Sequence, residues 1–130
     1  MIFADSNIWI FSNIQDYSEY PLAVRSLKKY EKEKIAINNI IFSEVSHKLS
    51  ALLGKEESIK RTRKMIDSEF TVYVEIDRET AMKSLQHALS LRINDALIAQ
   101  HAIDLKIPLL TDNLKDFKRI DNLNILPLRG

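Results

Sequence analysis

The sequence predicts an α/β fold in which a mainly parallel sheet is covered by helices on both faces. The expected strands are short apolar runs without polar alternation, which is typical of strands buried on both sides. Helical segments separate these runs, as the crossover connections of parallel strands require. The 130 residues contain no linker, repeat or low-complexity tract, so we expect a single domain over residues 1–130.

Residues 2–37 are expected to form a strand, a helix and a second strand. Residues 2–4 are an apolar run that ends at the polar turn Asp5–Asn7, which favours a buried strand. Residues 20–34 carry apolar side chains at helical spacing among lysines and arginines. The apolar run 35–37 ends at two asparagines and is the second strand candidate.

Residues 40–76 are expected to form two helices and a strand. Residues 40–53 are the clearest helix of the chain, and Gly54 occupies the position of a C-terminal cap. Residues 56–69 are strongly charged and predict an exposed helix. Residues 70–76 are rich in β-branched and aromatic side chains, which favour a strand.

The remaining residues are expected to form two more helices and two more strands. Asp77 is a candidate N-cap for a helix that ends near residue 89. A further helix is expected from residue 95 to about residue 106. Residues 108–110 and 124–126 are the last two strand candidates.

Composition excludes several classes of function. Lys and Arg number 19 and Asp and Glu 18, so bulk electrostatics does not predict nucleic-acid binding. Cysteine is absent, which excludes disulfides and thiolate zinc sites. Only 2 glycines are present, too few for a glycine-rich phosphate loop. No targeting segment and no apolar stretch of about 18 residues is visible, so we expect a cytoplasmic protein without a membrane contact.

Acidic side chains recur where the expected strands end. Asp5 follows the first strand, and Asp112 lies in the turn after the fourth. Ligands of parallel sheets bind beyond the carboxyl ends of the strands. Asp95 shares an apolar helix face, and Glu44 lies at the edge of the apolar stripe of its helix. Each acid alone has an ordinary alternative, as a turn residue, a helix start or a solvated flank. The functional hypothesis rests on their convergence at one edge.

Carboxylates that gather in an apolar setting repel one another, and a divalent cation removes that penalty. Mg²⁺ prefers oxygen ligands and retains waters, so one or two direct carboxylates are enough to bind it. The 3 histidines are scattered along the chain, which makes a zinc site a weaker hypothesis.

Four segments resemble the motifs of PIN-domain ribonucleases. Asp5-Ser6-Asn7 resembles the opening motif of that family, and Ser43-Glu44-Val45 resembles its helical glutamate. The stretch INDALIA at 93–99 is similar to its most recognisable segment, and LTDNLKDF at 110–117 to its closing motif. The resemblance covers nearly the whole chain in order, and the chain's size is most similar to VapC-type toxins of toxin–antitoxin pairs.

The resemblance implies a PIN-like three-layer fold with a five-stranded sheet and endonucleolytic cleavage of RNA with Mg²⁺ or Mn²⁺. It implies that Asp5, Glu44 and Asp95 are catalytic, metal-binding acids. Asn113 stands where the family has its fourth acid, so Asp116 is our first candidate for that role and Asp112 our second. The residues expected to orient ligands or water are Asn7, Thr111 and Asn113.

The resemblance also implies partners: an RNA substrate, a small cognate antitoxin and a second copy in a homodimer. Candidate contacts to the RNA backbone are Arg92, Lys115, Lys118 and Arg119. Two alternatives stay open. One is a haloacid-dehalogenase-like phosphatase, although that family has a second Asp where this chain has Asn7. The other is a non-catalytic PIN-like binding module.

Overall fold

A five-stranded sheet forms the centre of the molecule. The computed structural model describes residues 1–130, and all neighbouring strands pair in parallel in the order β3-β2-β1-β4-β5. The expectation of a mainly parallel five-stranded sheet is therefore confirmed. The strands are β1 (Ile2–Ala4), β2 (Ile35–Ile37), β3 (Thr71–Tyr73), β4 (Leu109–Thr111) and β5 (Ile125–Pro127).

Burial accounts for the lack of polar alternation in these strands. Every residue of β1, β2 and β4 is buried, because these strands lie inside the sheet with helices on both faces. The edge strands β3 and β5 are only partly buried. The third strand is also shorter than the run 70–76 predicted for it.

Seven α-helices accompany the sheet. They are α1 (Ser6–Asn13), α2 (Tyr20–Tyr30), α3 (Asn39–Leu53), α4 (Lys55–Asp67), α5 (Arg78–Ser84), α6 (Ile93–Leu105) and α7 (Leu114–Phe117). Short 3-10 turns follow α2 at Glu31–Glu33 and α5 at Leu85–His87. No helix is long and apolar enough to cross a membrane.

Two of these helices are absent from the sequence prediction, and a third begins at a different residue. Helix α1 is not among the expected elements, because its apolar residues 8–11 are consecutive, with Ser and Asn on either side, and so show no helical period. Helix α7 has four residues and lies where the sequence predicts a turn. Helix α6 begins two residues earlier than expected, which places Asp95 in its first turn.

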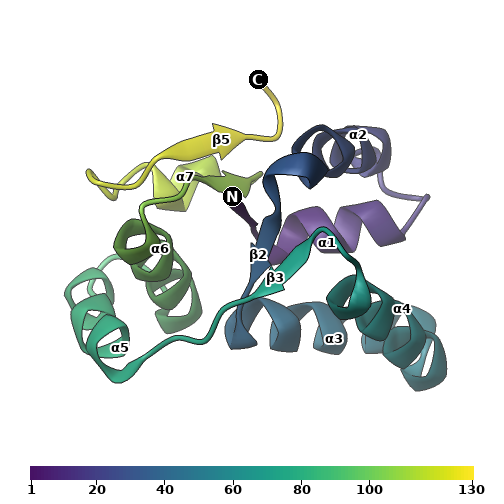
Figure 1. The fold of residues 1–130 in the computed structure, drawn as a ribbon, viewed down its shortest axis with the longest axis horizontal. Helices are drawn as coiled ribbons and strands as arrows, with labels where there is room; N and C mark the ends of the chain where they lie inside the picture. The colour runs from purple at the N-terminus through teal and green to yellow at the C-terminus, as the bar shows by residue number, and fades with distance from the viewer.

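Strand order determines which helices cover which face. Crossovers between parallel strands are right-handed, so a change in the direction of stepping moves the helices to the other face. From β1 to β3 each new strand is added on the same side of the previous one, whereas β4 is added on the opposite side of β1. Helices α1–α4 accordingly lie on one side of the sheet, and α5 and α6 on the other (Figure 1).

Capping fixes the ends of the helix that carries Glu44. The side chain of Asn38 accepts a hydrogen bond from the Ile41 amide and so caps the N-terminus of α3. The Asn38 amide also meets Nδ1 of the buried His101 on α6 at 3.0 Å. Gly54 ends α3 with φ of +89°, a backbone conformation that glycine adopts without strain.

Candidate active site

Strands β1 and β4 lie side by side where the connections of the sheet diverge. β1 leads to α1 on one face, whereas β4 is reached from α6 on the other face. Such a switch point opens a crevice at the carboxyl ends of the strands, where ligands of α/β sheets bind. Asp5 directly follows β1, and Thr111 is the last residue of β4. The two strands therefore bring residues 106 positions apart to one edge.

Asp5 is buried at this edge, with only 4% of its surface exposed. Its Oδ1 accepts a hydrogen bond from the Ser6 amide at 2.8 Å, so Asp5 caps α1. Its Oδ2 accepts from the Thr111 hydroxyl at 2.7 Å and from the Asn7 amide at 3.3 Å. Burial nevertheless raises the pKa of Asp5 to about 6, with smaller contributions from the negative charges of Asp95 and Glu44.

Glu44 is held by two residues that are sequence neighbours of the other acids. It projects from the second turn of α3 and is half-buried. The Ser6 hydroxyl donates to its Oε1 at 2.9 Å, and the Asn94 amide donates to its Oε2 at 3.4 Å. Because Ser6 follows Asp5 and Asn94 precedes Asp95, these two bonds connect three acid-bearing segments.

Asp95 lies in the first turn of α6 and is only 6% exposed. Burial is the main cause that raises its pKa, and the charges of Glu44 and Asp116 raise it further. Its only cationic partner is Arg92, whose Nε lies 3.7 Å from Oδ2 and which opposes the shift. The positive end of the α6 dipole also favours a negative charge here.

The two candidates for the fourth acid, Asp112 and Asp116, have different contacts. Asp116 accepts a hydrogen bond from the Asn113 amide at 3.2 Å, and its charge acts on Asp95. Asp112 instead forms a two-point ion pair with Arg129, at 2.9 Å and 3.2 Å. This arrangement favours Asp116 as the acid that belongs with the other three.

The carboxylates of Asp5, Glu44, Asp95 and Asp116 lie near one another, but their side chains are not arranged to bind one metal ion together. No group of three or more acidic or imidazole side chains is close enough to hold a metal ion as it stands. Each carboxylate points toward a hydrogen-bond or ion-pair donor of the protein. The donor chemistry fits a hard divalent cation, since all four groups offer oxygen and two of them have raised pKa values from crowding and burial.

The structure also shows residues of the site to which sequence patterns assign no such role. Ser6 lies in an expected polar turn and Asn94 just before an expected helix, whereas the side chains of both bind Glu44. Each of the two adjoins a candidate acid, which is the one signal that could have identified them. Arg129, which holds Asp112, has no such signal, because its contact depends on how β5 pairs with β4.

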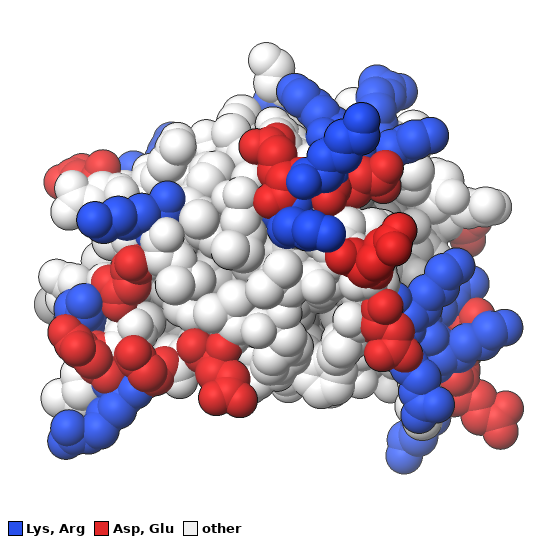
Figure 2. Space-filling model, viewed as in Figure 1, with Lys and Arg blue, Asp and Glu red and all other residues white.

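The candidate RNA contacts are exposed, and Arg92 is the one that contacts a candidate acid. Arg92 is 79% exposed and reaches Asp95, and Arg119 donates to the Ser90 carbonyl at 3.1 Å. Lys115 and Lys118 are exposed on or just after α7. Figure 2 shows the denser groups of Lys and Arg elsewhere, over α2 and α4, where acidic side chains are interspersed with them.

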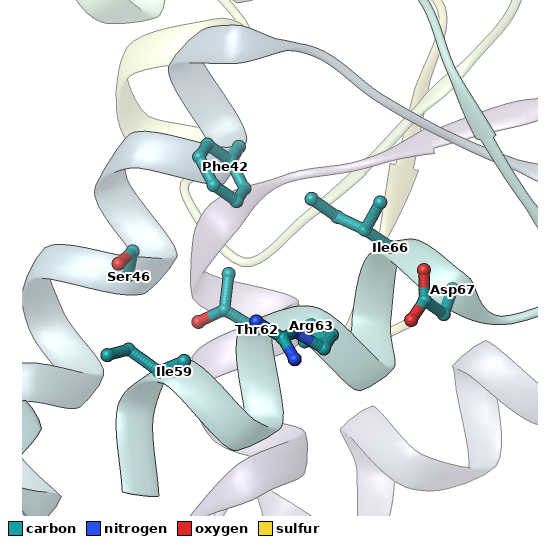
Figure 3. Close-up of a pocket in the computed structure, with 7 residues that line it drawn as sticks. All are labelled: Phe42, Ser46, Ile59, Thr62, Arg63, Ile66 and Asp67. Carbon is teal, nitrogen blue, oxygen red and sulfur yellow. The ribbon is translucent and has the colours of Figure 1, made fainter. Parts of the chain in front are cut away.

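A cavity of about 280 Å³ lies between α3 and α4. Figure 3 shows the side chains that line it, namely Phe42, Ser46, Ile59, Thr62, Arg63, Ile66 and Asp67. None of them is a candidate acid, so the candidate active site is not this cavity.

The fold and the acids of this edge define a class of protein. The family model of the PIN domain matches residues 2–123, and the chain belongs to the PIN domain family. It is 31% identical over 127 residues to Ribonuclease VapC2 of Rickettsia felis, an alignment that covers 92% of this chain and 91% of that protein.

Solved structures support the fold. A chain of VapBC2 from Rickettsia felis, bound to a DNA fragment from its promoter, matches with a TM-score of 0.78 and 24% identity and covers 98% of both chains. VapC20 of Mycobacterium tuberculosis, described as a sarcin-ricin loop cleaving toxin, matches with a TM-score of 0.75 and 11% identity over 88% of this chain and 93% of that one. At these identities the structures establish the three-layer fold alone.

Proposed function

We propose that this protein is an endoribonuclease that depends on Mg²⁺ or Mn²⁺ and is the toxin of a toxin–antitoxin pair. The observation that carries the proposal is the crowding of buried carboxylates at the switch point of a PIN-family sheet, where Asp5 has a pKa of about 6. The ribonuclease name of a relative with 31% identity supports the choice of RNA as the substrate. The proposed catalytic and metal-binding acids are Asp5, Glu44, Asp95 and Asp116.

The protein's own groups orient these acids. Thr111 and the Ser6 amide fix the two oxygens of Asp5, while Ser6 and Asn94 fix those of Glu44. Above pH 6 Asp5 is ionised, so it can act as a ligand or accept a proton from the attacking water. A divalent cation bound here would offset the charges of the carboxylates and the phosphate and would make that water more acidic.

Asp116 is the proposed fourth acid, and Asn113 supports it through a hydrogen bond of 3.2 Å. We expect Asp116→Asn to reduce cleavage far more than Asp112→Asn, because Asp112 is engaged by Arg129. Each variant removes one carboxylate charge from the segment that follows β4, so each serves as the control for the other. Equal losses in both would contradict this assignment.

The proposed partners follow from the chemistry of the site and from the relatives. Arg92 and Lys115 are proposed to contact RNA phosphates, because both are exposed beside the acids. A cognate antitoxin is proposed because one of the similar structures is a VapBC2 complex. Assembly with a second copy and a cytoplasmic location, where RNA is available, stay predictions.

The direct test is an RNA-cleavage assay on the purified protein with Mg²⁺ or Mn²⁺. We expect cleavage with either cation, loss of cleavage in EDTA, and loss in Asp95→Asn. Cleavage that persists in EDTA, or that Asp95→Asn retains, would identify a contaminating nuclease or a different mechanism and would remove the proposal.

A non-catalytic PIN-like module is the second candidate, in which Glu44 and Asp95 need no metal. A thermal-shift titration with Mn²⁺ distinguishes the two, since a ligand that binds the native state raises the unfolding temperature. The proposed nuclease requires a rise that Asp95→Asn weakens, whereas the module requires none. The phosphatase alternative has no support, because the family that matches is the PIN domain.

A further inference from the structure

Arg129 reaches the candidate active site from the segment that follows β5. Strand β5 pairs with β4 so that Pro127 lies beside Thr111, and the Leu128 amide donates to the Thr111 carbonyl at 3.0 Å. The Leu128 side chain is buried. Arg129 is therefore attached to a fixed point of the sheet, and Figure 1 shows the chain after β5 running beside α2.

The guanidinium of Arg129 holds two acids at once. Its Nε and Nη2 bind the two oxygens of Asp112 at 2.9 Å and 3.2 Å, and Nη2 also binds Oε2 of Glu19 at 2.6 Å. The side chains of Asp112 and Glu19 are only 20% and 18% exposed. Removal of Arg129 leaves these partly buried carboxylates facing each other without a cation. One cation that binds two acids distinguishes this cluster from an isolated surface ion pair, which contributes little.

Asp112 lies between the two residues that support the proposed catalytic acids. Thr111 donates to Asp5, and Asn113 donates both to Thr111 Oγ1 and to Asp116. The Asp112 amide itself donates to Asn7 at 3.4 Å. A change in the position of Asp112 therefore moves the supports of two acids together.

We propose that Arg129 is a positioning residue of the nuclease site: it keeps the Asp112 carboxylate away from the catalytic acids and holds the turn that orients Asp5 and Asp116. This inference rests on the proposed function. Arg129 touches neither acid, so its effect on cleavage passes through Asp112.

The test compares Arg129→Gln, Asp112→Asn and the double variant in RNA cleavage. We expect Arg129→Gln to lower kcat about tenfold with little change in KM, because displaced catalytic groups lose rate more than binding. The double variant is expected to recover to within about twofold of Asp112→Asn, since the unpaired charge is gone. Lys83→Gln is the matched control: it removes a half-exposed cation from Asp104, outside the site, and is expected to leave kcat unchanged.

Three outcomes overturn the inference. The first is an Arg129→Gln protein with the parent's kcat. The second is a rise in KM that Asp112→Asn does not relieve, which means that Arg129 binds RNA directly. The third is a double variant no more active than Arg129→Gln. If Arg129→Gln does not fold, Arg129→Lys keeps the charge without the planar fork, and we expect it to lower kcat less.

Failure of this inference differs from failure of the proposed function. A parent protein without divalent-dependent cleavage removes the function and, with it, the catalytic role of Arg129. An active parent with an unaffected Arg129→Gln overturns the positioning role alone. Unfolding temperatures measured for the same variants show whether a lost rate reflects a lost fold.

Discussion

Helix α6 carries an aspartate at each end, and the pKa values of the two are shifted in opposite directions. Asp104, in the last turn, accepts hydrogen bonds from Thr80, Lys83 and Gln100 at 2.6 to 2.9 Å. These donors outweigh the burial of Asp104 and lower its pKa. Asp95, in the first turn, has Arg92 at 3.7 Å as its only cationic partner, and burial together with two nearby acids raises its pKa.

The difference shows what distinguishes a structural acid from a candidate functional one in this fold. Asp95 is more deeply buried than Asp104, with 8% of its side chain exposed against 19%, and burial is the main cause of its raised pKa. Asp5 accepts three hydrogen bonds, as Asp104 does, and its pKa is still raised by burial and by its acidic neighbours. The candidate site is therefore marked by deeply buried acids that lie near one another, rather than by a shortage of donors.

The largest expected contrast is between Asp95→Asn and Asp104→Asn in RNA cleavage. Asp95→Asn is expected to reduce cleavage by at least about 100-fold, the usual cost of removing a charge from a preorganised site. Asp104→Asn is expected to retain activity at a temperature where it is folded. Similar activity in the two variants would abolish the distinction between the two ends of α6.

Asp5 provides the next contrast, in stability rather than rate. Its folded-state pKa of about 6 lies above the ordinary value of 3.8, so its contribution to stability is present below pH 3.8 and is lost as pH rises through 6. Two pKa units correspond to on the order of 3 kcal/mol. Without divalent cations, Asp5→Asn should therefore unfold at higher urea than the parent at pH 8 and show little advantage at pH 4. A constant difference across this range would contradict the sign.

Asp104 is expected to show the opposite trend. Its pKa is lowered, so its contribution to stability is present at neutral pH and is lost as acid protonates the carboxyl group. We expect Asp104→Asn to reduce the free energy of unfolding by about 1–3 kcal/mol at pH 7, the usual value for hydrogen bonds to a charged group. Urea unfolding at pH 7 and pH 4 measures the change, which should shrink at the lower pH.

The smallest effect is expected at Arg92. Its side chain is mostly exposed and its ion pair with Asp95 is long, so Arg92→Gln should change the free energy of unfolding by less than about 0.5 kcal/mol. If Arg92 contacts an RNA phosphate, the same variant should raise KM several-fold and make it less sensitive to salt. An unchanged KM would leave Arg92 as a solvated surface residue.

Much of the fold could be predicted because its central strands are buried on both faces. Ile35–Ile37 could be identified as a strand from three residues, since a non-alternating apolar run of this length between polar turns is too short for a helix and is typical of a buried strand. Helix α1 could not, because its apolar residues 8–11 are consecutive and show no helical period. The predicted start of α6 was two residues too late, because the N-terminal turn of a helix leaves only a weak signal in the sequence.

The candidate acids of the site could be identified from the sequence, but the residues that bind and orient them could not. Asp5 and Asp95 stand at recognisable positions relative to a strand and a helix. The bonds from Ser6 and Asn94 to Glu44 span 38 and 50 residues, and the contact of Arg129 with Glu19 spans 110. Contacts of this range follow from strand order, which local patterns do not determine.

Strand order also has a consequence for the protein during its synthesis. β4 is made after β1, β2 and β3, yet it occupies the place beside β1, and its last residue supports Asp5. A nascent chain that still lacks residues 109–117 has neither that support nor Asp116. The acidic edge therefore assembles only after residues 109–117 have been made, which would delay any cleavage of RNA until β4 has paired with β1.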